Sequence, residues 1–421
     1  MYELIGDEIY FIKSNIHNVD LVYAPLKRKL FYVRDLEYDL VKQSYYKNCF
    51  HIEDKLCNNL ERIRNTKNQL VSNSNVGMRG NRAVFLITNK CNLACKYCYA
   101  KEEHNIDSLH MELFEQVVDF IFKCSNEAKH FTFIGGGEPF ADWELLKNCI
   151  LYIRRTQGKH IAYIGVQTNA TLLSKEKIDF LKRYNVKIGC SFDILPNLQN
   201  SHRPFGNGKK KSFDIVDEAI HMCIDNGVIP HIRSTISKSE CGKMPDMVEF
   251  AINHYPEIKV IHLEHVSDKG LTWDNYYREF MYNFFEARQI AAKKGIYLKN
   301  SITRAVNSLK TRFCSGEMCI TTQGDIVACH RVSGEKDNLF QRFNYGKIDK
   351  GVQIYNEKLD EINKMFGTKR LMKCDNCFCK YHCAGQCCNN KNAYNDNDYE
   401  ELCRFTQEMV RRELEYVLGL K

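Results

Sequence analysis

The sequence predicts an α/β protein built around a partial (β/α)6 TIM-like barrel, with a small α+β unit before it and a cysteine-rich domain after it. Three observations support this fold class. Strand-like and helix-like segments alternate six times in the middle of the chain, the first 80 residues contain a hairpin pattern, and ten of the 20 cysteines lie between Cys314 and Cys403. We therefore divide the 421 residues into three parts, residues 1–80, 81–300 and 301–421.

The first part reads as a hairpin followed by a helix. Two apolar runs, Leu21–Ala24 and Leu30–Val33, flank the turn-like segment Pro25–Lys29. Asp35 is placed to cap a helix that runs through Leu36, Leu40 and Val41. The polar stretch 71–77 predicts a linker to the next part.

The middle part supplies the barrel. Six strand–helix units imply a parallel sheet with right-handed crossovers, and six are too few to close an eightfold barrel. The predicted strands are Ala83–Thr88, His130–Ile134, Ile161–Thr168, Val186–Phe192, Pro230–Ile236 and Lys259–Val266. The clearest helices are Met111–Cys124, Trp143–Arg155, Lys175–Tyr184 and Phe213–Asn226. In such folds the chemistry lies at the carboxyl ends of the strands.

Composition narrows the class of protein. The net charge of +8 is modest and the charges are dispersed, so the basic run Lys209–Lys211 is interpreted as a solvated loop, and no nucleic-acid partner is expected. The acidic start does not resemble a signal peptide, and no apolar run approaches the ~20 residues of a membrane span. We therefore expect a cytoplasmic protein with no membrane partner. In a reducing compartment, clustered cysteines indicate metal rather than disulfides.

A cysteine triad follows the first barrel strand directly. Cys91, Cys95 and Cys98 have the spacing C-x3-C-x2-C. Three thiolates on one loop can hold three irons of a cubane cluster and leave the fourth iron open, as a catalytic zinc keeps one open position. A structural zinc site, or cysteines that are simply buried, would be the alternatives.

Together with Tyr97 before its last cysteine, this triad resembles the signature of the radical S-adenosylmethionine (SAM) family. The segment Gly135–Pro139 reads Gly-Gly-Gly-Glu-Pro and resembles the Gly-Gly-Glu-Pro segment that binds the amino group of SAM in that family. Glycines allow a ligand to approach the backbone closely. The resemblance implies cofactor contacts from Tyr97, Gly136, Gly137, Glu138 and Pro139.

Two later strand ends extend the resemblance. Gln167–Leu173 is similar to a recurrent Gln-Thr-Asn-Gly-Thr-Leu segment, with Ala170 in place of the glycine. Ser191-Phe192-Asp193 resembles the family's Ser-Leu-Asp, and an arginine follows at position 203. The resemblance implies further cofactor contacts, although a turn or capping role is an alternative for each: Gln167, Asn169, Ser191 and Arg203.

The resemblance also implies the chemistry. A reduced [4Fe–4S] cluster passes one electron to the sulfonium of SAM, and the resulting 5′-deoxyadenosyl radical abstracts hydrogen from a substrate. The cofactor performs this step while the protein orients it and excludes water.

The C-terminal cysteines resemble a second known pattern, the SPASM domain, which binds two auxiliary [4Fe–4S] clusters and would bring the total to three. The matching residues are Cys314, Gly324, Cys329, Cys374, Cys377, Cys383, Cys387 and Cys403. The family's interleaved pattern implies one cluster held by Cys374, Cys377, Cys383 and Cys403, and another held by Cys314, Cys329 and Cys387. Cys319 is a candidate fourth ligand for the second cluster, and a zinc ribbon is the alternative for this segment.

The remaining cysteines have no place in either pattern. Cys379 and Cys388 stay unassigned. The scattered ones are expected to be small buried apolar residues: Cys49, Cys57, Cys124, Cys149, Cys190, Cys223 and Cys241.

Members with this C-terminal domain mostly modify peptides or proteins. Anaerobic sulfatase-maturing enzymes carry an aspartate after the cysteine at position 329, whereas this chain has His330-Arg331. The resemblance therefore favours maturation of ribosomally made peptides, with a leader-bearing peptide and a reductant such as flavodoxin or ferredoxin as partners. The N-terminal hairpin and helix resemble units that capture leaders as an added strand; an ordinary packing extension is the alternative. His330 is a candidate proton acceptor, or a histidine that only hydrogen-bonds near a cluster.

Two other classes compete with an enzyme of this kind. An electron-carrying iron–sulfur protein would not need the Gly-Gly-Glu-Pro and Ser191 matches, because it has no SAM to bind. A zinc-dependent nucleic-acid binder would contain zinc in place of iron and sulfide.

Overall fold

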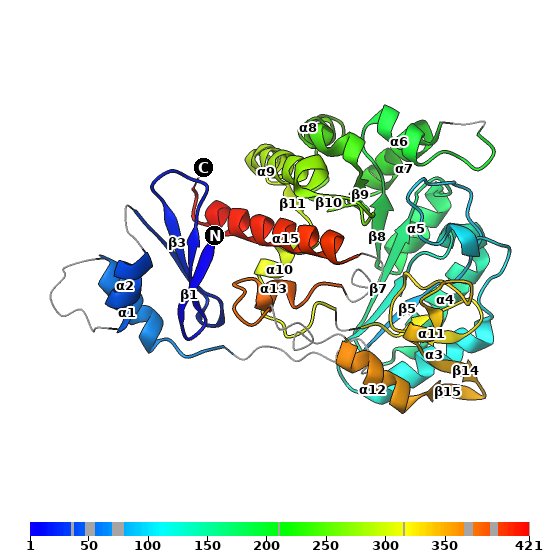
Figure 1. Cartoon of the computed structure of the whole chain (residues 1–421). Coiled ribbons are helices and arrows are strands. Elements are labelled where there is room, and N and C mark those ends of the chain that lie inside the picture. Colours follow the sequence, from blue (N-terminus) through cyan, green and yellow to red (C-terminus); the bar gives the residue numbers. More distant parts are fainter. Residues whose placement is uncertain are drawn as a thin grey trace.

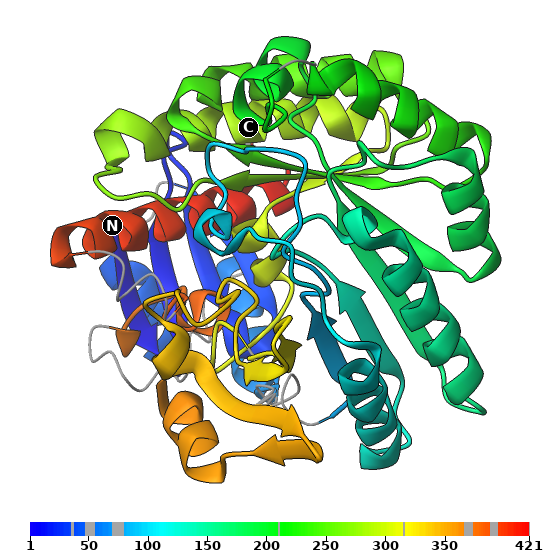
Figure 2. The same ribbon diagram turned by 90° about the vertical axis from the view of Figure 1, so that its right-hand side faces the viewer.

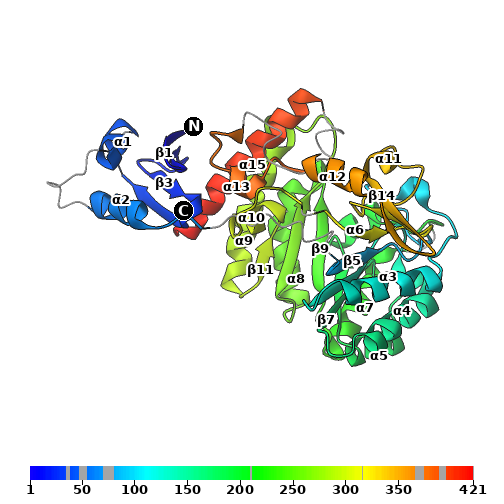
Figure 3. The same cartoon turned by 90° about the horizontal axis from the view of Figure 1, so that it is seen from below.

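A computed structural model describes residues 1–34, 38–46, 55–69, 80–208, 211–314, 316–365, 374–387 and 395–420. The N-terminal unit lies at one end of the molecule and the barrel at the other (Figures 1 and 3). The long C-terminal helix α15 (Asp396–Val417) runs between them and contacts both (Figure 1).

The N-terminal unit is a four-stranded antiparallel sheet with two helices. The strands pair in chain order, and the predicted hairpin is present, with Tyr23 opposite Leu30. The elements are β1 (Tyr2–Gly6), β2 (Ile9–Lys13), β3 (Asp20–Ala24), β4 (Lys29–Val33), α1 (Tyr38–Tyr46) and α2 (Lys55–Asn65). Strands β1 and β2 were not predicted. The expected cap at Asp35 and the expected linker at 71–77 lie outside the described residues.

Both faces of this sheet are buried, which the alternation of β2 explains. Ile9 and Phe11 point to one face and pack with the two helices, whereas Tyr10 and Ile12 point to the other and join the core shared with the barrel. The unit is therefore held by the rest of the protein through an apolar face.

The barrel sheet contains all six predicted strands in parallel, in the order β10-β9-β8-β7-β6-β5. A seventh parallel strand, β11 (Tyr297–Lys299), pairs with β10 and was missed because three residues show no clear periodicity. The six are β5 (Arg82–Phe85), β6 (Lys129–Phe133), β7 (Ala162–Thr168), β8 (Val186–Ser191), β9 (His231–Ile236) and β10 (Val260–His265).

Helices cover one face of this curved sheet (Figure 2). They are α3 (Met111–Cys124), α4 (Trp143–Thr156), α5 (Lys175–Arg183), α6 (Pro196–His202), α7 (Ser212–Asp225), α8 (Met244–His254) and α9 (Arg278–Lys293). Alternate strand residues such as Ile232 and Ile236 pack against these helices, so His231 and Arg233 between them project to the opposite, inner face. The inner face is where a substrate can approach the sheet.

The C-terminal part continues the same sheet. Strand β12 (Cys319–Ile320) pairs in parallel with β5, and β13 (Asp325–Val327), β14 (Asn344–Asp349) and β15 (Gly351–Ile354) follow in antiparallel order. The result is one sheet of eleven strands among the described residues. The other helices here are α10 (Ser301–Val306), α11 (Phe340–Phe343), α12 (Asn356–Met365) and α13 (Lys380–Cys383).

Helix α15 begins at a cap and buries one long face. The Asn395 side chain accepts a hydrogen bond from the Asp398 backbone N–H at 2.8 Å. Leu402, Phe405 and Met409 then enter the barrel-side core. Within the described parts of the chain, no helix is both long and apolar enough to cross a membrane.

Candidate cofactor site

The cysteine triad lies on the loop that leaves β5. Two backbone hydrogen bonds fix this loop against the end of α6, from Ala94 N to the Pro204 carbonyl at 2.8 Å and from Lys96 N to the His202 carbonyl at 2.9 Å. All three cysteines are free thiols and half-buried. The loop therefore offers three unoxidised sulfur ligands at the carboxyl end of the first barrel strand.

Burial dominates the electrostatics of these thiols. It raises the pKa of Cys91 to about 12, and Glu138 and the neighbouring thiols add to the effect. It also raises the pKa of Cys95, which the Arg203 guanidinium partly offsets. Thiols that are reluctant to ionise alone become thiolates when a metal binds, because the metal displaces the proton.

The glycine-rich loop that follows β6 packs directly on the cysteine loop. Gly135 and Gly136 have φ of +33° and +82°, a region that favours glycine. A Cβ on Gly137 would overlap the backbone carbonyl of Lys90. Gly137 N also donates to the Thr88 carbonyl at 2.8 Å. The glycines are thus required for the close approach of these two loops.

Glu138 is buried and ties this loop to the end of β7. Its carboxylate accepts hydrogen bonds from Thr168 Oγ1 at 2.6 Å, from Asn169 N at 2.6 Å and from Phe140 N at 3.2 Å. Burial raises its pKa to about 6, against these hydrogen bonds. Pro139 begins the short 3-10 helix that follows, with Glu138 as its cap.

Asn169 links the end of β7 to the cysteine loop. Its Nδ2 donates to Asn92 Oδ1 at 3.0 Å, and its Oδ1 accepts from Thr171 N at 3.0 Å. Ala170, which replaces the family's glycine, has φ of +63°. The chain thus adopts a left-handed turn at this position although the residue carries a Cβ.

Gln167 and Ser191 lie side by side on the inner face of the sheet. Gln167 Nε2 donates to Ser191 Oγ at 2.9 Å. Gly189 lies between Gln167 and His231 on neighbouring strands. It has no room for a side chain, because a Cβ there would overlap Gln167 Oε1 and lie 2.9 Å from His231 Nε2. This part of the inner face is therefore lined by polar groups.

Arg203 is fully engaged by the protein. Its guanidinium bonds the Asp193 carboxylate at 3.1 and 3.3 Å and lies 5.1 Å from the ring centre of Tyr97. The Tyr97 hydroxyl also donates to Asp193, and Ser234 Oγ donates to Asp193 at 3.1 Å. This network packs against the cysteine loop, where Arg203 is a neighbour of both Cys95 and Tyr97.

Four C-terminal cysteines surround one cavity of about 230 Å³: Cys374, Cys377, Cys383 and Cys403. Cys379 lines it too. A hydrogen bond with the Cys379 thiol is the main cause that lowers the pKa of Cys377, to about 6. Gln407 Nε2 lies 3.6 Å from Cys377 Sγ and Gln386 Nε2 lies 3.7 Å from Cys403 Sγ. The structure thus brings these four cysteines together around one cavity, with Cys379 as a fifth thiol.

The second C-terminal group combines Cys314, Cys329 and Cys387, whose thiols influence one another electrostatically. Burial raises the pKa of Cys314 to about 11. Cys319 is fully buried in β12, and Cys329 is among the groups that raise the pKa of its thiol. Cys319 also packs in the apolar core that the barrel helices share.

His330 faces an acidic partner. Its Nδ1 lies 2.7 Å from Glu317 Oε2, and its backbone N–H donates to the same oxygen at 3.1 Å. Burial would raise the pKa of Glu317, but His330 and then Arg82 outweigh it and hold that pKa at about 2. His330 thus packs beside the second cysteine group, next to Tyr99.

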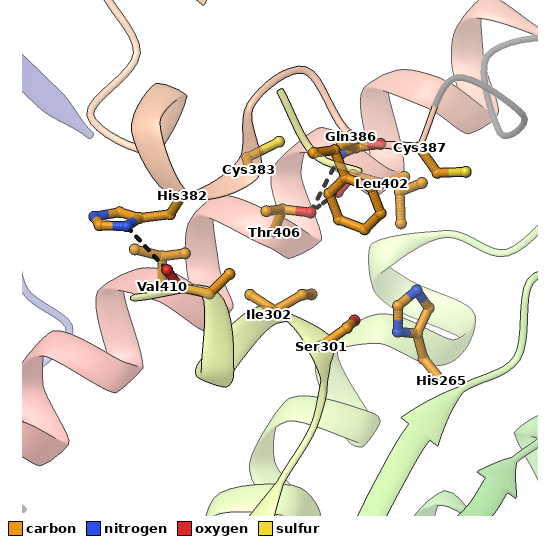
Figure 4. A pocket seen from close by; sticks show the side chains of 12 residues that line it. His265, Ser301, Ile302, His382, Cys383, Gln386, Cys387, Leu402, Thr406 and Val410 are labelled. Carbon is orange, nitrogen blue, oxygen red and sulfur yellow. Dashed lines mark hydrogen bonds between the residues drawn. The ribbon is translucent and has the colours of Figure 1, made fainter. Parts of the chain in front are cut away.

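An apolar pocket connects the two cysteine groups with the barrel (Figure 4). Cys383 and Cys387 line it from the cysteine segment, and Leu402 and Val410 line it from α15. His265, at the end of β10, lies at the opposite wall (Figure 4). The pocket is a contact zone between the C-terminal part and the carboxyl end of the barrel.

Sequence reasoning overlooked several members of these networks. Asp193 stands in the quoted Ser-Phe-Asp segment, so its motif could have revealed it, whereas nothing in the sequence marks Asn92 or Glu317. Among the scattered cysteines, the prediction of burial is right for Cys149, Cys190, Cys223 and Cys241, but wrong for Cys124, which is exposed at the end of α3, where a helix terminus meets solvent. Cys57 is half-buried. Cys49 and Cys388 lie outside the described residues.

Residues 85–240 match the family model of the radical SAM superfamily. This segment contains the cysteine triad, the glycine-rich loop and the strand ends described above. The chain therefore contains a radical SAM domain, and the family of that domain implies SAM and a [4Fe–4S] cluster as cofactors.

Two curated proteins illustrate the relationship. The chain is 22% identical to the radical SAM cyclopropyl synthase TigE of Paramaledivibacter caminithermalis over 91% of this chain and 83% of TigE. It is 28% identical to AlbA, the antilisterial bacteriocin subtilosin biosynthesis protein of Bacillus subtilis, over 40% of this chain and 36% of AlbA. It is also related to sulfatase-maturating enzymes.

A solved structure supports the fold. Native anSMEcpe with bound AdoMet and Kp18Cys peptide superposes with a TM-score of 0.67 at 16% identity, over 80% of this chain and 99% of that one. At this identity the likeness concerns the fold alone.

The residues present fit the implied cofactors. Three free thiols on one loop supply the sulfur ligands that a cubane cluster takes, and the fourth iron would lack a ligand from this loop. The buried Asn89 Oδ1 beside Gly136 has no hydrogen-bond partner in the described part of the molecule, so the glycine-rich loop retains a polar atom available to a ligand.

Proposed function

We propose that this protein is a peptide maturase that cleaves SAM reductively and modifies a ribosomally made peptide. The observation that carries the proposal is the meeting of the cysteine triad, the glycine-rich loop and the ends of β7 and β8 at one edge of the barrel. When bound, the cofactors supply an electron that breaks a carbon–sulfur bond of SAM, and the adenosyl fragment then removes hydrogen from the substrate.

In this proposal, the protein's own residues hold and shield the reactants. Cys91, Cys95 and Cys98 ligate the catalytic cluster. Glu138 provides a buried carboxylate for the SAM ammonium, and Gly136 and Gly137 allow its close approach. The further contacts in the proposal are Tyr97, Pro139, Gln167, Asn169, Ser191 and Arg203, of which Arg203 acts by positioning the cysteine loop.

The C-terminal part would hold two auxiliary [4Fe–4S] clusters in a SPASM-like domain over residues 301–421. The cavity lined by Cys374, Cys377, Cys383 and Cys403 supports one of them. The grouping of Cys314, Cys329 and Cys387, with Cys319 as a candidate fourth ligand, supports the other. A flavodoxin or ferredoxin would deliver electrons, and residues 1–80 would receive the leader of the peptide.

Peptide maturation is preferred to the alternatives for specific reasons. The relative AlbA is a biosynthesis protein of the bacteriocin subtilosin. Formylglycine formation in a sulfatase is the second candidate, because sulfatase-maturating enzymes are also relatives, but His330 replaces the aspartate that those enzymes carry. Paired with Glu317, His330 is a proposed proton acceptor in either case.

The decisive experiment uses protein reconstituted without oxygen, reduced with dithionite and supplied with SAM. We expect 5′-deoxyadenosine and about twelve irons per chain, falling to about eight irons and no cleavage in the triple variant Cys91→Ala/Cys95→Ala/Cys98→Ala. Cys124→Ala, at an exposed thiol on α3, is the matched control and should behave like the unmodified protein. Zinc in place of iron, or iron without cleavage, would contradict the catalytic proposal.

The peptide part needs its own test. Co-expression with a library of candidate leader-bearing peptides, followed by mass spectrometry, should reveal a peptide whose mass changes only with the active enzyme. Cleavage of SAM with no mass change in any of these peptides would contradict maturation and leave the radical chemistry intact.

A further inference from the structure

The inner face of the barrel carries a row of basic side chains, and two of them, Arg233 and Lys299, form no ion pair with a carboxylate of the described residues. By strand register, Ser191 on β8 lies next to Arg233 on β9, Arg233 next to His262 on β10, and His262 next to Lys299 on β11. The side chains of this row share one face, because their strand neighbours Ile232, Ile261 and Leu298 pack into the helix-side core. With strands about 4.8 Å apart, the Cα atoms of Arg233 and Lys299 are about 10 Å apart.

The basic groups in and beside the row lower one another's pKa. The pKa of Lys299 is lowered by burial, then by Arg304 and by Arg233. The pKa of His231, two residues before Arg233, is lowered by burial and then by Lys299, Arg233 and His262. Arg233, Lys299 and Arg304 form no ion pair with any carboxylate of the described residues. Like charges gathered in this way repel and favour an anion between them.

Glu264 is an acid close to the row, and its carboxylate already has several partners. Glu264, two residues beyond His262, accepts hydrogen bonds from His262 Nε2 at 2.6 Å and from Ser301 Oγ at 2.7 Å and N at 3.0 Å, and His265 Nδ1 lies 3.1 Å away. This carboxylate is therefore engaged by the end of β10 and the start of α10, and it forms no ion pair with Arg233 or Lys299.

From this arrangement we propose that Arg233, Lys299 and Arg304 form a carboxylate-binding site that receives an Asp or Glu side chain of the peptide being modified. The inference rests on the proposed function and names its substrate class, an acidic peptide segment entering the barrel. Arginine and lysine bind carboxylates strongly where a face is partly shielded from water.

SAM has a carboxylate too, and Ser191 stands in the same row. The site nevertheless extends three strands beyond β8, to Lys299 on β11, and on to Arg304 on α10, and three cations exceed what one cofactor carboxylate would neutralise. Arg233 lies nearest to Ser191. Variants of Lys299 and Arg304 therefore test whether the bound carboxylate belongs to the peptide or to SAM.

The test measures binding of two fluorescein-labelled, capped hexapeptides to the cluster-reconstituted enzyme, one of six glutamates and one of six glutamines. We expect the glutamate peptide to bind the unmodified enzyme at least about tenfold more tightly than the glutamine peptide, and less tightly at 200 mM than at 50 mM salt. Lys299→Gln and the exposed Arg304→Gln should each remove most of this preference. SAM affinity, measured in parallel by calorimetry, should stay unchanged in both.

Arg183→Gln is the matched control, since Arg183 is an exposed cation at the end of α5 on the helix side of the sheet. Three outcomes would overturn the proposal: no preference for glutamate in the unmodified enzyme, an equal loss in Arg183→Gln, or loss of SAM binding alone in Lys299→Gln, which would assign the site to the cofactor. If Lys299→Gln does not fold, the glutamate preference of Arg304→Gln provides the test. Failure here with normal SAM cleavage would leave the proposed function standing.

Discussion

Glu264 shows how a single carboxylate can organise the end of a strand. It gathers two histidines and the first residue of α10 at the carboxyl end of β10, beside the pocket that reaches the auxiliary cysteines. Burial alone would raise its pKa, but the hydrogen bond with His262 and the nearby His265 imidazole outweigh it and hold that pKa well below the ordinary value of 4.5.

Replacing this carboxylate should therefore be costly and pH-dependent. We expect Glu264→Gln to lower the free energy of unfolding by about 3 kcal/mol at pH 7, since it leaves buried partners without their counter-charge. A pKa that is lower in the folded state gives stability that is present above pH 4.5 and lost as the pH falls below it. The difference in the free energy of unfolding between Glu264→Gln and the unmodified protein should therefore become smaller as the pH falls below 4.5.

Urea unfolding followed by circular dichroism at several pH values measures this gap. The exposed Glu257→Gln serves as the control and should show no comparable loss at any pH. A gap that stays constant down to pH 3 would show that the charge of Glu264 contributes nothing.

Ala170 gives a second prediction, about backbone conformation. Its φ of +63° is unfavourable for any residue with a Cβ, by about 1–2 kcal/mol. Ala170→Gly removes this backbone strain. It also costs about 0.4–1 kcal/mol of chain entropy and a buried methyl group, so stability should change by less than about 1 kcal/mol.

Ala170→Val should instead lose about 2 kcal/mol or more, because a branched side chain is both strained at this φ and too large for a buried site. Thermal unfolding of the two variants, beside Ala219→Gly in the interior of α7, provides the comparison. Equal losses from glycine and valine at position 170 would disprove the conformational explanation.

The sequence allowed much of the candidate site to be predicted, because its ligands cluster in short loops. Cys91, Cys95 and Cys98 lie within eight residues, and Gly135–Pro139 is contiguous. The support for those loops was not predictable. Asp193 contacts Tyr97 across 96 residues and Glu317 contacts Arg82 across 235, and such pairings depend on the fold rather than on local spacing.

At the scale of elements, α15 depends on one ion pair that faces the barrel. Arg288 on α9 holds Glu413 on α15 through both of its terminal nitrogens, with one bond at 3.0 Å, and both side chains are largely buried. Burial raises the pKa of Glu413, and Arg288 opposes that effect. This pair is a two-point polar link between the two helices.

Replacing Arg288 alone should lower the free energy of unfolding far more than replacing Arg288 and Glu413 together. We expect Arg288→Met to lower the free energy of unfolding by about 3–5 kcal/mol, because it leaves the Glu413 carboxylate buried and alone. The double variant Arg288→Met/Glu413→Leu should recover most of that loss. Denaturant unfolding of the two variants measures both effects, and an equal loss in each would contradict the explanation.

The elements also show where pattern-based prediction ends. The six longer barrel strands were recognisable because each is an apolar or alternating run followed by a helix. Strands β11 and β12 have three and two residues, too few for any periodicity. They form because neighbouring strands offer them unpaired backbone groups, and this information comes from the rest of the sheet.

At the scale of the whole molecule, the cysteine-rich C-terminal part is integrated with the barrel. Val84 N and Leu86 N of the first barrel segment donate to the Met318 and Ile320 carbonyls at 2.9 Å each. Ile320 is fully buried in the same core as the barrel helices. The barrel and the C-terminal strands therefore share backbone pairing and side-chain packing, although the chain connects them through more than 200 residues.

We accordingly expect Ile320→Ala to destabilise both regions together, by about 2–5 kcal/mol. Hydrogen–deuterium exchange should accelerate in the peptide containing residues 83–86 as well as in the peptide containing residues 319–327. Faster exchange confined to the C-terminal peptide would mean that the two regions open independently.

The pairing of β5 with β12 also has a consequence for how the protein is made. At about 5–20 residues per second, a ribosome needs on the order of 10–50 s after completing β5 before β12 emerges. During that interval the edge of β5 that β12 will occupy lacks its C-terminal partner. The order of synthesis thus leaves this edge of the barrel sheet uncovered until the last quarter of the chain is made.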